Sequence, residues 1–571
     1  MRLLISRILR YTTLSSAMAM GLLSACGGSD DGSGAPAAPT AVLMTCAQLV
    51  NMQIPSTAIG LPSTGAVITA ATTVAANGTG SAAVGEYCLA TGKIMPVDPT
   101  APDIQFKVAL PTTWNSKVLM RGGGGWNGSI PAVAGNILNT TAASPLGRGY
   151  AVFGSDSGHQ SAASIDASFS ANPEAFRNWI GDALKKTRDA ALVVVKAIYG
   201  SAPTKSYFVG SSTGGREALA VAGRWPADWD GVVALYPSHD AAVQILGMLA
   251  EARALAAPGA YMNSAKRGVL YGAALAACDA LDGVNDGVIS NVQRCNTIFD
   301  PTTALLNGLP VRCAGGADTG DTCLSDAQLA ALTKINSPVL FNFSLANGET
   351  SFPGYNVLVS DNGIPTDPAP LQPTLASLGF GLAPPAFPVT GSMLAGLQYA
   401  DSFVRYAIAG DATFNTLAID ASNPGSLASR FSEFSALDNA DRNLTPFAEK
   451  GGKLLIMHGT ADTLVSPRRS ELYVQQLRAT MGADKVDSFL RFYEVPGFGH
   501  SVSAQFNASW DQLTAIESWV EKSVDPATNQ IVTDTLGVPG RTRPLCLYPT
   551  WPKYKGSGDV NSAASFTCSS S

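Results

Sequence analysis

A serine lies between two glycines at a point where the chain could change from strand to helix. Residues 210–214 read Gly-Ser-Ser-Thr-Gly, which fits the pattern G-x-S-x-G with Ser212 at its centre. The run 206–209 before it favours a strand, and residues 215–224 after it favour a helix. Such a strand–turn–helix lifts the hydroxyl above a sheet, where it can act as a nucleophile if a base takes its proton. The alternative is a connecting loop rich in Ser and Gly.

Chain order selects the base and its acidic partner. In this strand–turn–helix arrangement the acid follows the serine, and the histidine follows the acid. Asp462 comes just after a predicted strand at 453–457, and His500 is the only histidine beyond it. We expect Ser212 to be the nucleophile, Asp462 to orient the histidine, and His500 to act as base and then as acid. Two other histidines are expected mainly to support the structure, although the first could line the site: His159 and His458.

Backbone N–H groups must stabilise the oxyanion that such an attack creates. One donor should be the amide of Thr213, the residue after the nucleophile. The other should come from the run Gly122–Gly125, with Gly125 as the chosen candidate, because glycines let the backbone approach a substrate closely. The alternative for this run is a plain flexible turn.

Strands alternate with helices on both sides of a long irregular region. The predicted elements are strands at 104–110, 117–120, 150–154, 206–209, 231–236, 453–457 and 489–495, with long helices at 173–198 and 467–481. This alternation predicts an α/β fold with a mostly parallel sheet. We expect an α/β-hydrolase core formed by residues 41–239 and 446–571, with residues 240–445 inserted as a lid domain. The alternative is that the insertion is a separate domain with its own task.

The ends of the chain and its composition indicate export. The 571 residues are 46% hydrophobic and only 14% charged, with a net charge of −6, which argues against nucleic-acid binding. Residues 1–25 combine a basic start with a short apolar run and resemble a lipoprotein signal peptide, with Cys26 as the lipidated residue and 26–40 as a tether. We expect an exported outer-membrane lipoprotein that contacts membrane only through this anchor. An ordinary cleaved signal peptide is the alternative.

Eight cysteines remain after Cys26, and an even number in an exported chain favours disulfides. Closeness in sequence favours four pairs, with buried free thiols as the alternative: Cys46–Cys88, Cys278–Cys295, Cys313–Cys323 and Cys546–Cys568. Between the second pair, Asp279, Asp282 and Asp286 alternate with glycines and could surround a hard cation. The spacing is not that of an EF-hand. From the spacing alone, a solvated loop without a metal ion is an equally good interpretation.

Several stretches together resemble the tannase/feruloyl esterase family, which includes mono(2-hydroxyethyl) terephthalate hydrolases. They extend over nearly the whole chain after residue 120: GGGGWNG (122–128), SDSGH (155–159), SYFVGSSTGGREAL (206–219), RWPADWDGVVA (224–234), CDALDGVNDGV (278–288), GGKLLIMHGTADTLVSP (451–467), VPGFGH (495–500) and GRTRPLC (540–546). The resemblance implies hydrolysis of esters of aromatic acids. It also implies a structural Ca²⁺ bound by the side chains of Asp279, Asp282 and Asp286 and the carbonyls of Val284 and Val288, and it implies the same four disulfides.

The chain departs from this family next to the catalytic residues. The resemblance implies a cysteine just before the nucleophile and another just after the histidine, joined as a disulfide, but here the positions hold Ser211 and Ser501. The loss of both partners together suggests a concerted change. A contact between the two hydroxyls could replace the bond, or the geometry of Ser212 and His500 could be looser.

Substrate selection should come largely from the lid. The candidates are Trp126 and Phe403 as aromatic contacts and Arg405 as a partner for a substrate carboxylate, with Tyr406 and Phe431 as further lid candidates. We expect a small aromatic ester as substrate and a monomeric protein. The alternatives are an esterase for aliphatic hydroxyacid esters or oligomers, and a non-catalytic envelope lipoprotein.

Overall fold

A computed structural model describes residues 43–364, 371–438 and 440–570. Cys26, the expected signal peptide and the expected tether lie outside these residues. Residues Leu43–Ser571 form one compact unit, so the predicted lid is not a body separate from the core.

A ten-stranded sheet forms the centre of this unit, in the order β1-β2-β3-β4-β6-β5-β7-β8-β13-β14. Neighbours from β6 to β14 run parallel, whereas β1 to β4 and the β4/β6 pair run antiparallel. The strands are β1 (Gln53–Ile54), β2 (Ala66–Val74), β3 (Tyr87–Ile94), β4 (Ile104–Pro111), β5 (Lys117–Arg121), β6 (Ala151–Ser155), β7 (Lys205–Ser211), β8 (Gly231–Leu235), β13 (Lys453–Gly459) and β14 (Leu490–Val495). The predicted strands are all present, and β1 to β3 are additional.

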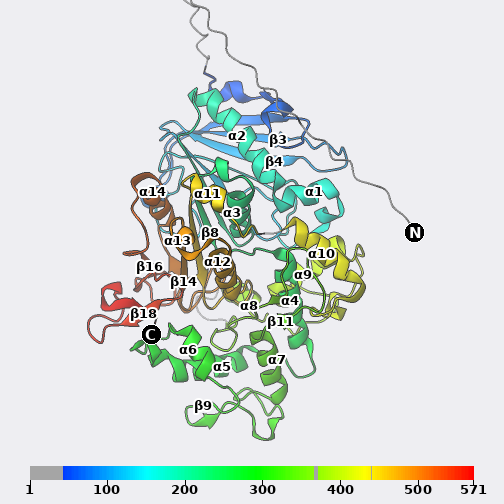
Figure 1. The fold of residues 1–571 in the computed structure, drawn as a ribbon, viewed down its shortest axis with the longest axis vertical. Coiled ribbons are helices and arrows are strands. Elements are labelled where there is room, and N and C mark those ends of the chain that lie inside the picture. The colour runs from blue at the N-terminus through cyan, green and yellow to red at the C-terminus, as the bar shows by residue number, and fades with distance from the viewer. Residues whose placement is uncertain (1–42, 365–370, 439, 571) are drawn as a thin grey trace, which may run out of the picture. The chain divides into compact units, whose positions relative to one another are not determined.

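The parallel strands are buried on both faces, as their apolar sequences require. In β8 every residue is buried; Val232 and Ala234 belong to the core on one face, and Val233 and Leu235 to the core on the other. The antiparallel strand β3 instead alternates between buried and half-buried residues. Figure 1 shows β3 and β4 in blue, far along the chain from β14 in brown.

Helices cover both faces of this sheet. They are α1 (Pro173–Arg177), α2 (Ala183–Tyr199), α3 (Thr213–Arg224), α12 (Pro467–Met481), α13 (Ala483–Asp487) and α14 (Gln512–Lys522). The single helix expected at 173–198 is two helices, because Asn178–Asp182 form a π-helical turn in which Gly181 is not helical. A Cβ at Gly181 would lie 2.7 Å from Arg224 Nη1, so a larger residue here would displace the end of that side chain.

The inserted segment lies between the adjacent strands β8 and β13, and its longer regular elements are helices separated by irregular chain. In Figure 1 it is coloured green to yellow, with α5, α6 and α7 at its far end from β3 and β4. Its elements are α4 (Ala241–Ala256), α5 (Ser264–Cys278), α6 (Val292–Ile298), β9 (Leu305–Leu306), β10 (Leu309–Pro310), α7 (Asp326–Asn336), β11 (Val339–Leu340), β12 (Ser351–Phe352), α8 (Gln372–Leu378), α9 (Ala395–Phe403), α10 (Ala428–Leu437) and α11 (Thr445–Glu449). This lid has its own apolar core, which also includes Trp126, Trp179 and Ile180 from the hydrolase core.

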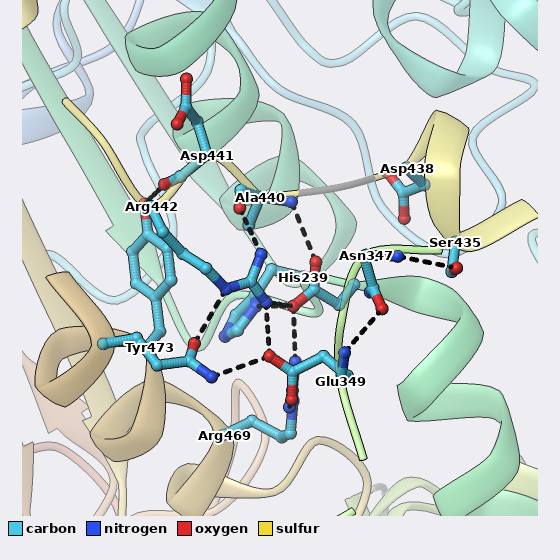
Figure 2. Close-up of polar contacts among 12 residues, drawn as sticks. His239, Asn347, Glu349, Ser435, Asp438, Ala440, Asp441, Arg442, Arg469 and Tyr473 are labelled. Carbon is cyan, nitrogen blue, oxygen red and sulfur yellow. Dashed lines mark hydrogen bonds and ion pairs between the residues drawn. The ribbon is translucent and has the colours of Figure 1, made fainter. Parts of the chain in front are cut away.

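A buried ion-pair cluster joins the two ends of the lid to α12, and we call it the lid clamp. Asp240 Oδ2, at the start of the lid, accepts hydrogen bonds from Arg442 Nη2 at 2.7 Å and Arg469 Nη2 at 2.6 Å. Glu349, from the middle of the lid, pairs with the same two arginines at 2.6 and 3.0 Å. Figure 2 shows Arg442 and Arg469 converging on Glu349, with His239 beside them.

Four disulfides and a set of short strands fix the periphery. The pairs are those that the sequence predicts, with Cα–Cα distances of 5.6, 5.5, 5.0 and 5.5 Å: Cys46–Cys88, Cys278–Cys295, Cys313–Cys323 and Cys546–Cys568. The C-terminal part of the chain adds two small antiparallel sheets. One contains β15 (Ala508–Ser509), β16 (Ile531–Asp534) and β17 (Thr542–Pro544), and the other contains β18 (Trp551–Tyr554) and β19 (Phe566–Ser569). Among the described residues, no helix has the length and apolar character needed to cross a membrane.

Candidate active site

Ser212 occupies the sharp turn between β7 and α3. Its φ of 59° places it in the left-handed region, which a residue with a side chain adopts at a cost of about 1–3 kcal/mol. Its N–H donates to the carbonyl of Leu235 at 3.0 Å, which fixes the turn to the end of β8. A Cβ at Gly210 would lie 2.1 Å from the carbonyl oxygen of Gly214, so this turn needs the glycine. The result is a nucleophile elbow.

The three residues selected by chain order lie in one hydrogen-bonded line. His500 Nε2 is 2.9 Å from Ser212 Oγ, and His500 Nδ1 is 2.7 Å from Asp462 Oδ2. Because a carboxylate only accepts, Nδ1 carries the proton and Nε2 is left to accept from the serine hydroxyl. This is the arrangement in which a histidine can remove the proton of a serine during attack.

Asp462 is fully buried and accepts from every neighbour. Its Oδ1 accepts the N–H groups of Leu464 and Val465 at 2.9 and 2.8 Å, and its Oδ2 also lies 3.2 Å from His458 Nε2. Burial by itself would raise the pKa of Asp462, but the charge of His500 and the hydrogen bonds from both histidines hold it well below its ordinary value. The carboxylate therefore stays ionised, and His458 supports it, with its own Nδ1 2.8 Å from Ser470 Oγ.

Backbone donors suited to an oxyanion lie beside Ser212. Thr213 is the first residue of α3, where a helix offers its N–H no internal acceptor. In the glycine run, Gly122 N–H donates to Val209 O at 3.0 Å and Gly123 N–H to the buried Glu217 at 2.9 Å. No acceptor among the described residues takes the N–H of Gly124 or Gly125. The candidates thus narrow to Thr213, Gly125 and Gly124, and the Thr213 hydroxyl holds Gly125 in place through its carbonyl at 2.5 Å.

A cavity of about 410 Å³ opens over the serine. One wall is the segment after the glycine run, with Ser129, Pro131, Ala132, Ile137 and Leu138. Other parts of the wall are Leu378 and Tyr399 from the lid and Leu464 from the loop that carries Asp462. Arg121, at the end of β5, also lines the cavity; neither this residue nor Tyr399 is predicted from the sequence. The volume suits a ligand of one or two rings.

The residues expected to select the substrate do not line this cavity. Phe403 is fully buried among Trp126, Trp179 and Phe434, with ring centroids 4.7–5.7 Å away, so it forms part of the lid core. Trp126 is only 6% exposed in the same cluster. Arg405 donates to Ala412 O and pairs with Asp401 at 3.2 Å. Phe431 is likewise fully buried. Aromatic residues in the insertion packed with one another because the lid needs a core of its own.

The loop that follows His500 is held by an asparagine. Asn139 Nδ2 donates to the carbonyl of Ser501 at 3.0 Å, and its Oδ1 accepts the hydroxyl of Tyr236 at 2.8 Å. Tyr236 in turn packs edge-on to His500, with ring centroids 4.8 Å apart. Ser211 and Ser501 both line the cavity, but no hydrogen bond joins their hydroxyls in the described structure. That these positions hold a disulfide in other family members stays a prediction.

Two other histidines are buried away from the cavity wall. His159 stacks on Phe169 at 3.7 Å, and burial lowers its pKa to about 4. His239 lies beside Asp240 in the lid clamp, with Nδ1 3.5 Å from its carboxylate. Among the described residues neither imidazole has a hydrogen-bond partner that meets ordinary geometry. His159 therefore supports the structure rather than lining the site.

In the aspartate loop, residues 279–288, some carboxylates already accept hydrogen bonds or ion pairs from the protein itself. Asp279 accepts the N–H groups of Asp286 and Gly287 at 3.3 and 3.0 Å, while Asp286 forms an ion pair with Arg543. In the described part of the chain no three acidic, histidine or cysteine side chains lie close enough together to hold a metal ion. Asp282 is nevertheless fully buried, and its Oδ2 has no partner among the described residues.

The serine, the acid and the histidine each follow a strand of a largely parallel sheet, and the lid is inserted before the strand that leads to the acid. This arrangement defines an α/β-hydrolase. The tannase and feruloyl esterase family model matches residues 88–569. The chain therefore belongs to the tannase and feruloyl esterase family, and it is a carboxylic ester hydrolase.

Relatives and solved structures agree with this assignment. An uncharacterised esterase of Agrobacterium fabrum is 37% identical over 93% of this chain and 94% of that protein. A mono(2-hydroxyethyl) terephthalate hydrolase of Piscinibacter sakaiensis is 30% identical over 86% of this chain and 85% of that protein. The crystal structure of feruloyl esterase B from Aspergillus oryzae covers 92% of this chain and 100% of its own, with a TM-score of 0.71 and 20% identity, which supports the fold.

Proposed function

We propose that this protein is a serine carboxylesterase that hydrolyses esters of aromatic acids, of the feruloyl, galloyl or terephthalate-monoester type, through an acyl-enzyme. The hydrogen-bonded line Ser212–His500–Asp462 under the cavity carries the proposal. The choice of aromatic acids rests on relatives named as a mono(2-hydroxyethyl) terephthalate hydrolase and as probable feruloyl esterases.

The geometry supports a two-step reaction. Ser212 Oγ attacks the ester carbonyl while its proton passes to His500 Nε2, and Asp462 stabilises the imidazolium that forms. The N–H groups of Thr213 and Gly125 stabilise the oxyanion. His500 then gives its proton to the alcohol oxygen, so that the C–O bond breaks and an acyl-serine remains. Water attacks this ester with His500 again as base, which releases the acid and restores the Ser212 hydroxyl.

The walls of the cavity also favour a second candidate. Ile137, Leu138, Leu378 and Leu464 are aliphatic, and Tyr399 is the one aromatic residue that the described lid adds to the wall. An esterase for aliphatic hydroxyacid esters or oligomers would use such a surface equally well. The two candidates differ in substrate and share the catalytic residues.

A substrate panel separates these candidates. Methyl ferulate, methyl gallate, a terephthalate monoester and short aliphatic esters are compared by kcat/KM, and aromatic esters are expected to be preferred at least tenfold. Ser212→Ala should lose nearly all activity on every ester and should lose labelling by a fluorophosphonate probe, with an unchanged circular dichroism spectrum. Failure of the wild type to label would favour the non-catalytic lipoprotein.

A structural Ca²⁺ at the aspartate loop forms part of this proposal. The side chains of Asp279, Asp282 and Asp286 and the carbonyls of Val284 and Val288 would hold it, and the ion would stabilise the lid without taking part in chemistry. The support is the unpartnered buried oxygen of Asp282. Burial, with smaller effects from Asp286 and Asp279, raises the pKa of this carboxyl to about 7. Coordination by Asp286 would require it to exchange Arg543 for the ion.

The calcium site predicts a pH-dependent stability. A carboxyl whose pKa is raised in the folded state stabilises the fold below its ordinary pKa and loses that contribution as pH rises toward 7. With EGTA, the thermal midpoint should therefore fall between about pH 4 and about pH 7, and added Ca²⁺ should remove the part of this fall that Asp282 causes. Asp282→Asn should abolish the effect of Ca²⁺ and make the fall shallower, but should not remove it, because burial also raises the pKa of Asp156 to about 7. A thermal midpoint that changes with neither EGTA nor Ca²⁺ at any pH would contradict the proposed calcium site.

Export and anchoring complete the proposal. Four disulfides support an oxidising compartment outside the cytosol. The protein is proposed to be a monomeric outer-membrane lipoprotein, lipidated at Cys26. Cys26→Ser should move the protein from the membrane fraction to the soluble fraction of the producing cells, and unchanged fractionation would contradict the anchor.

A further inference from the structure

One cationic side chain faces the active-site cavity. Arg121 is the last residue of β5 and directly precedes the glycine run, so the sheet itself sets its position. It is the only lysine, arginine, aspartate or glutamate among the described residues that line the cavity. The guanidinium lies on the side of the wall formed by Pro131, Ala132 and the residues that follow.

The guanidinium is positioned by carbonyls and is not neutralised. Arg121 Nη1 donates to the carbonyls of Ala132 at 2.5 Å and Gly135 at 3.1 Å. No described acidic side chain lies within ion-pair distance, and no described acceptor takes the hydrogens of Nε or Nη2. Burial lowers the pKa of Arg121, with no acidic neighbour to offset it.

Some buried arginines of this protein have acidic partners: Arg216 pairs with Asp438 at 2.7 Å, and Arg469 pairs with Asp240 at 2.6 Å. Arg267, which is also buried, instead donates to the carbonyls of Asn362, Gly363 and Gly381. A partly buried cation without such a partner is unfavourable unless something else neutralises it. What distinguishes Arg121 from Arg267 is that it lines the cavity where substrate binds. A planar fork of donors on a cavity wall matches a carboxylate.

We infer that Arg121 binds the carboxylate of the substrate and thereby determines specificity. The preferred substrates would be esters in which the arm along residues 129–138 ends in a carboxylate. This inference rests on the proposed ester hydrolysis and adds to it the charge of the substrate. Binding of the substrate carboxylate, which the sequence predicts for Arg405 in the lid, is thus assigned to Arg121 in the central sheet.

The test compares pairs of esters in which one carboxyl is either a free carboxylate or a methyl ester. On the acid arm, monomethyl terephthalate is compared with dimethyl terephthalate; on the alcohol arm, 4-acetoxybenzoate is compared with its methyl ester. The wild type should prefer the carboxylate in one pair. Arg121→Gln, which keeps donors for the Ala132 and Gly135 carbonyls, should lower the carboxylate-to-neutral ratio of kcat/KM in that pair by about 10- to 100-fold. Arg121→Lys should lose less of this ratio than Arg121→Gln.

A matched control and an independent readout make the outcome decisive. Arg405→Gln removes a lid arginine outside the cavity and should leave both ratios unchanged. For the wild type, benzoate should inhibit hydrolysis of p-nitrophenyl acetate more strongly than benzamide does, and this result does not depend on the folding of any variant. Equal inhibition, equal losses for both members of a pair in Arg121→Gln, or a changed ratio in Arg405→Gln would each overturn the inference. A wild type that neither labels with fluorophosphonate nor cleaves p-nitrophenyl acetate would instead refute the proposed function.

Discussion

The catalytic centre and the lid clamp each contain a fully buried aspartate that remains ionised. Burial would raise the pKa of both carboxyls, yet hydrogen bonds and positive neighbours lower it in each. Around Asp462 these neighbours are His500 and His458. Around Asp240 the positive neighbours are Arg469 and Arg442, and burial lowers the pKa of the adjacent His239. A histidine can give up its proton near neutral pH and an arginine cannot.

This difference in partners separates chemistry from structure. At Asp462 the partner His500 must change between its neutral and its charged form during each reaction. The carboxylate assists because it stabilises the charged imidazolium. At Asp240 the two arginines stay charged, and the carboxylate holds these cations and the Ala440 N–H in place. Removing each carboxylate should therefore affect different measurements.

Asp462→Asn is expected to have the largest effect on activity. The amide cannot hold the tautomer of His500 that accepts the serine proton, and kcat should fall by about ten-thousand-fold. Activity on p-nitrophenyl acetate is measured beside urea unfolding, where a smaller loss of stability than in Asp240→Asn is expected, because the amide oxygen can still accept the N–H groups of Leu464 and Val465. Activity within tenfold of the wild type would contradict the assignment of Asp462.

Asp240→Asn should instead act on stability. Arg442 and Arg469 would then share only Glu349, and breaking a buried pair in this way costs about 3–5 kcal/mol. Urea unfolding measures the change, while kcat on p-nitrophenyl acetate should stay within about threefold at a temperature where the variant is folded. A large loss of kcat without a loss of stability would show that the clamp belongs to the catalytic machinery.

Low pH should reduce the contribution of both aspartates, Asp240 and Asp462, to the stability of the folded protein. Because both pKa values are lowered on folding, the unfolded chain takes up these protons first, near pH 4. The contribution of each carboxylate is present above that pH and is lost as pH falls further. The loss of stability between pH 5 and pH 3 should be shallower in Asp240→Asn and in Asp462→Asn than in the wild type. An unchanged acid limb in both variants would contradict the lowered pKa values.

Asn139→Ala should give the smallest effect and tests how tightly the catalytic side is held. Without the bonds to Ser501 and Tyr236, the loop carrying His500 loosens, and kcat should fall by about tenfold with little change in KM. Asn115→Ala is the control, because it removes a similar bond, to the carbonyl of Arg148, before the start of β5. Equal effects of the two substitutions on kcat would show that Asn139 has no special role at the site.

The catalytic residues could be predicted from the sequence, but the residues that line the cavity could not. Ser212, Asp462 and His500 follow strands of strong apolar pattern, and the order of elements in a parallel sheet brings such positions to one edge. Leu378 and Tyr399 come from helices in an insertion without regular rhythm, so no periodicity indicates which side chains reach the serine. Arg121 had a usable signal: a charged residue ends a buried strand and directly precedes the glycine run.

The same distinction explains why the predicted substrate contacts do not line the cavity. Phe403, Arg405 and Trp126 were chosen by residue type, but an insertion of this size must bury aromatic rings to be stable, and Phe403 and Trp126 do so. Strands β1 to β3 escaped prediction because half-buried antiparallel strands rich in Ala, Thr and Gly carry a weak pattern.

The adjacency of β8 and β13 has a consequence for how such enzymes can diversify. The lid departs from one strand and returns to its immediate neighbour, so its content can change without altering the pairing of any strand. The clamp then sets the condition for exchange: a replacement lid must supply a partner for Arg469 where Glu349 and Asp240 now stand. Recombination at these two boundaries would give new specificities on an unchanged catalytic scaffold.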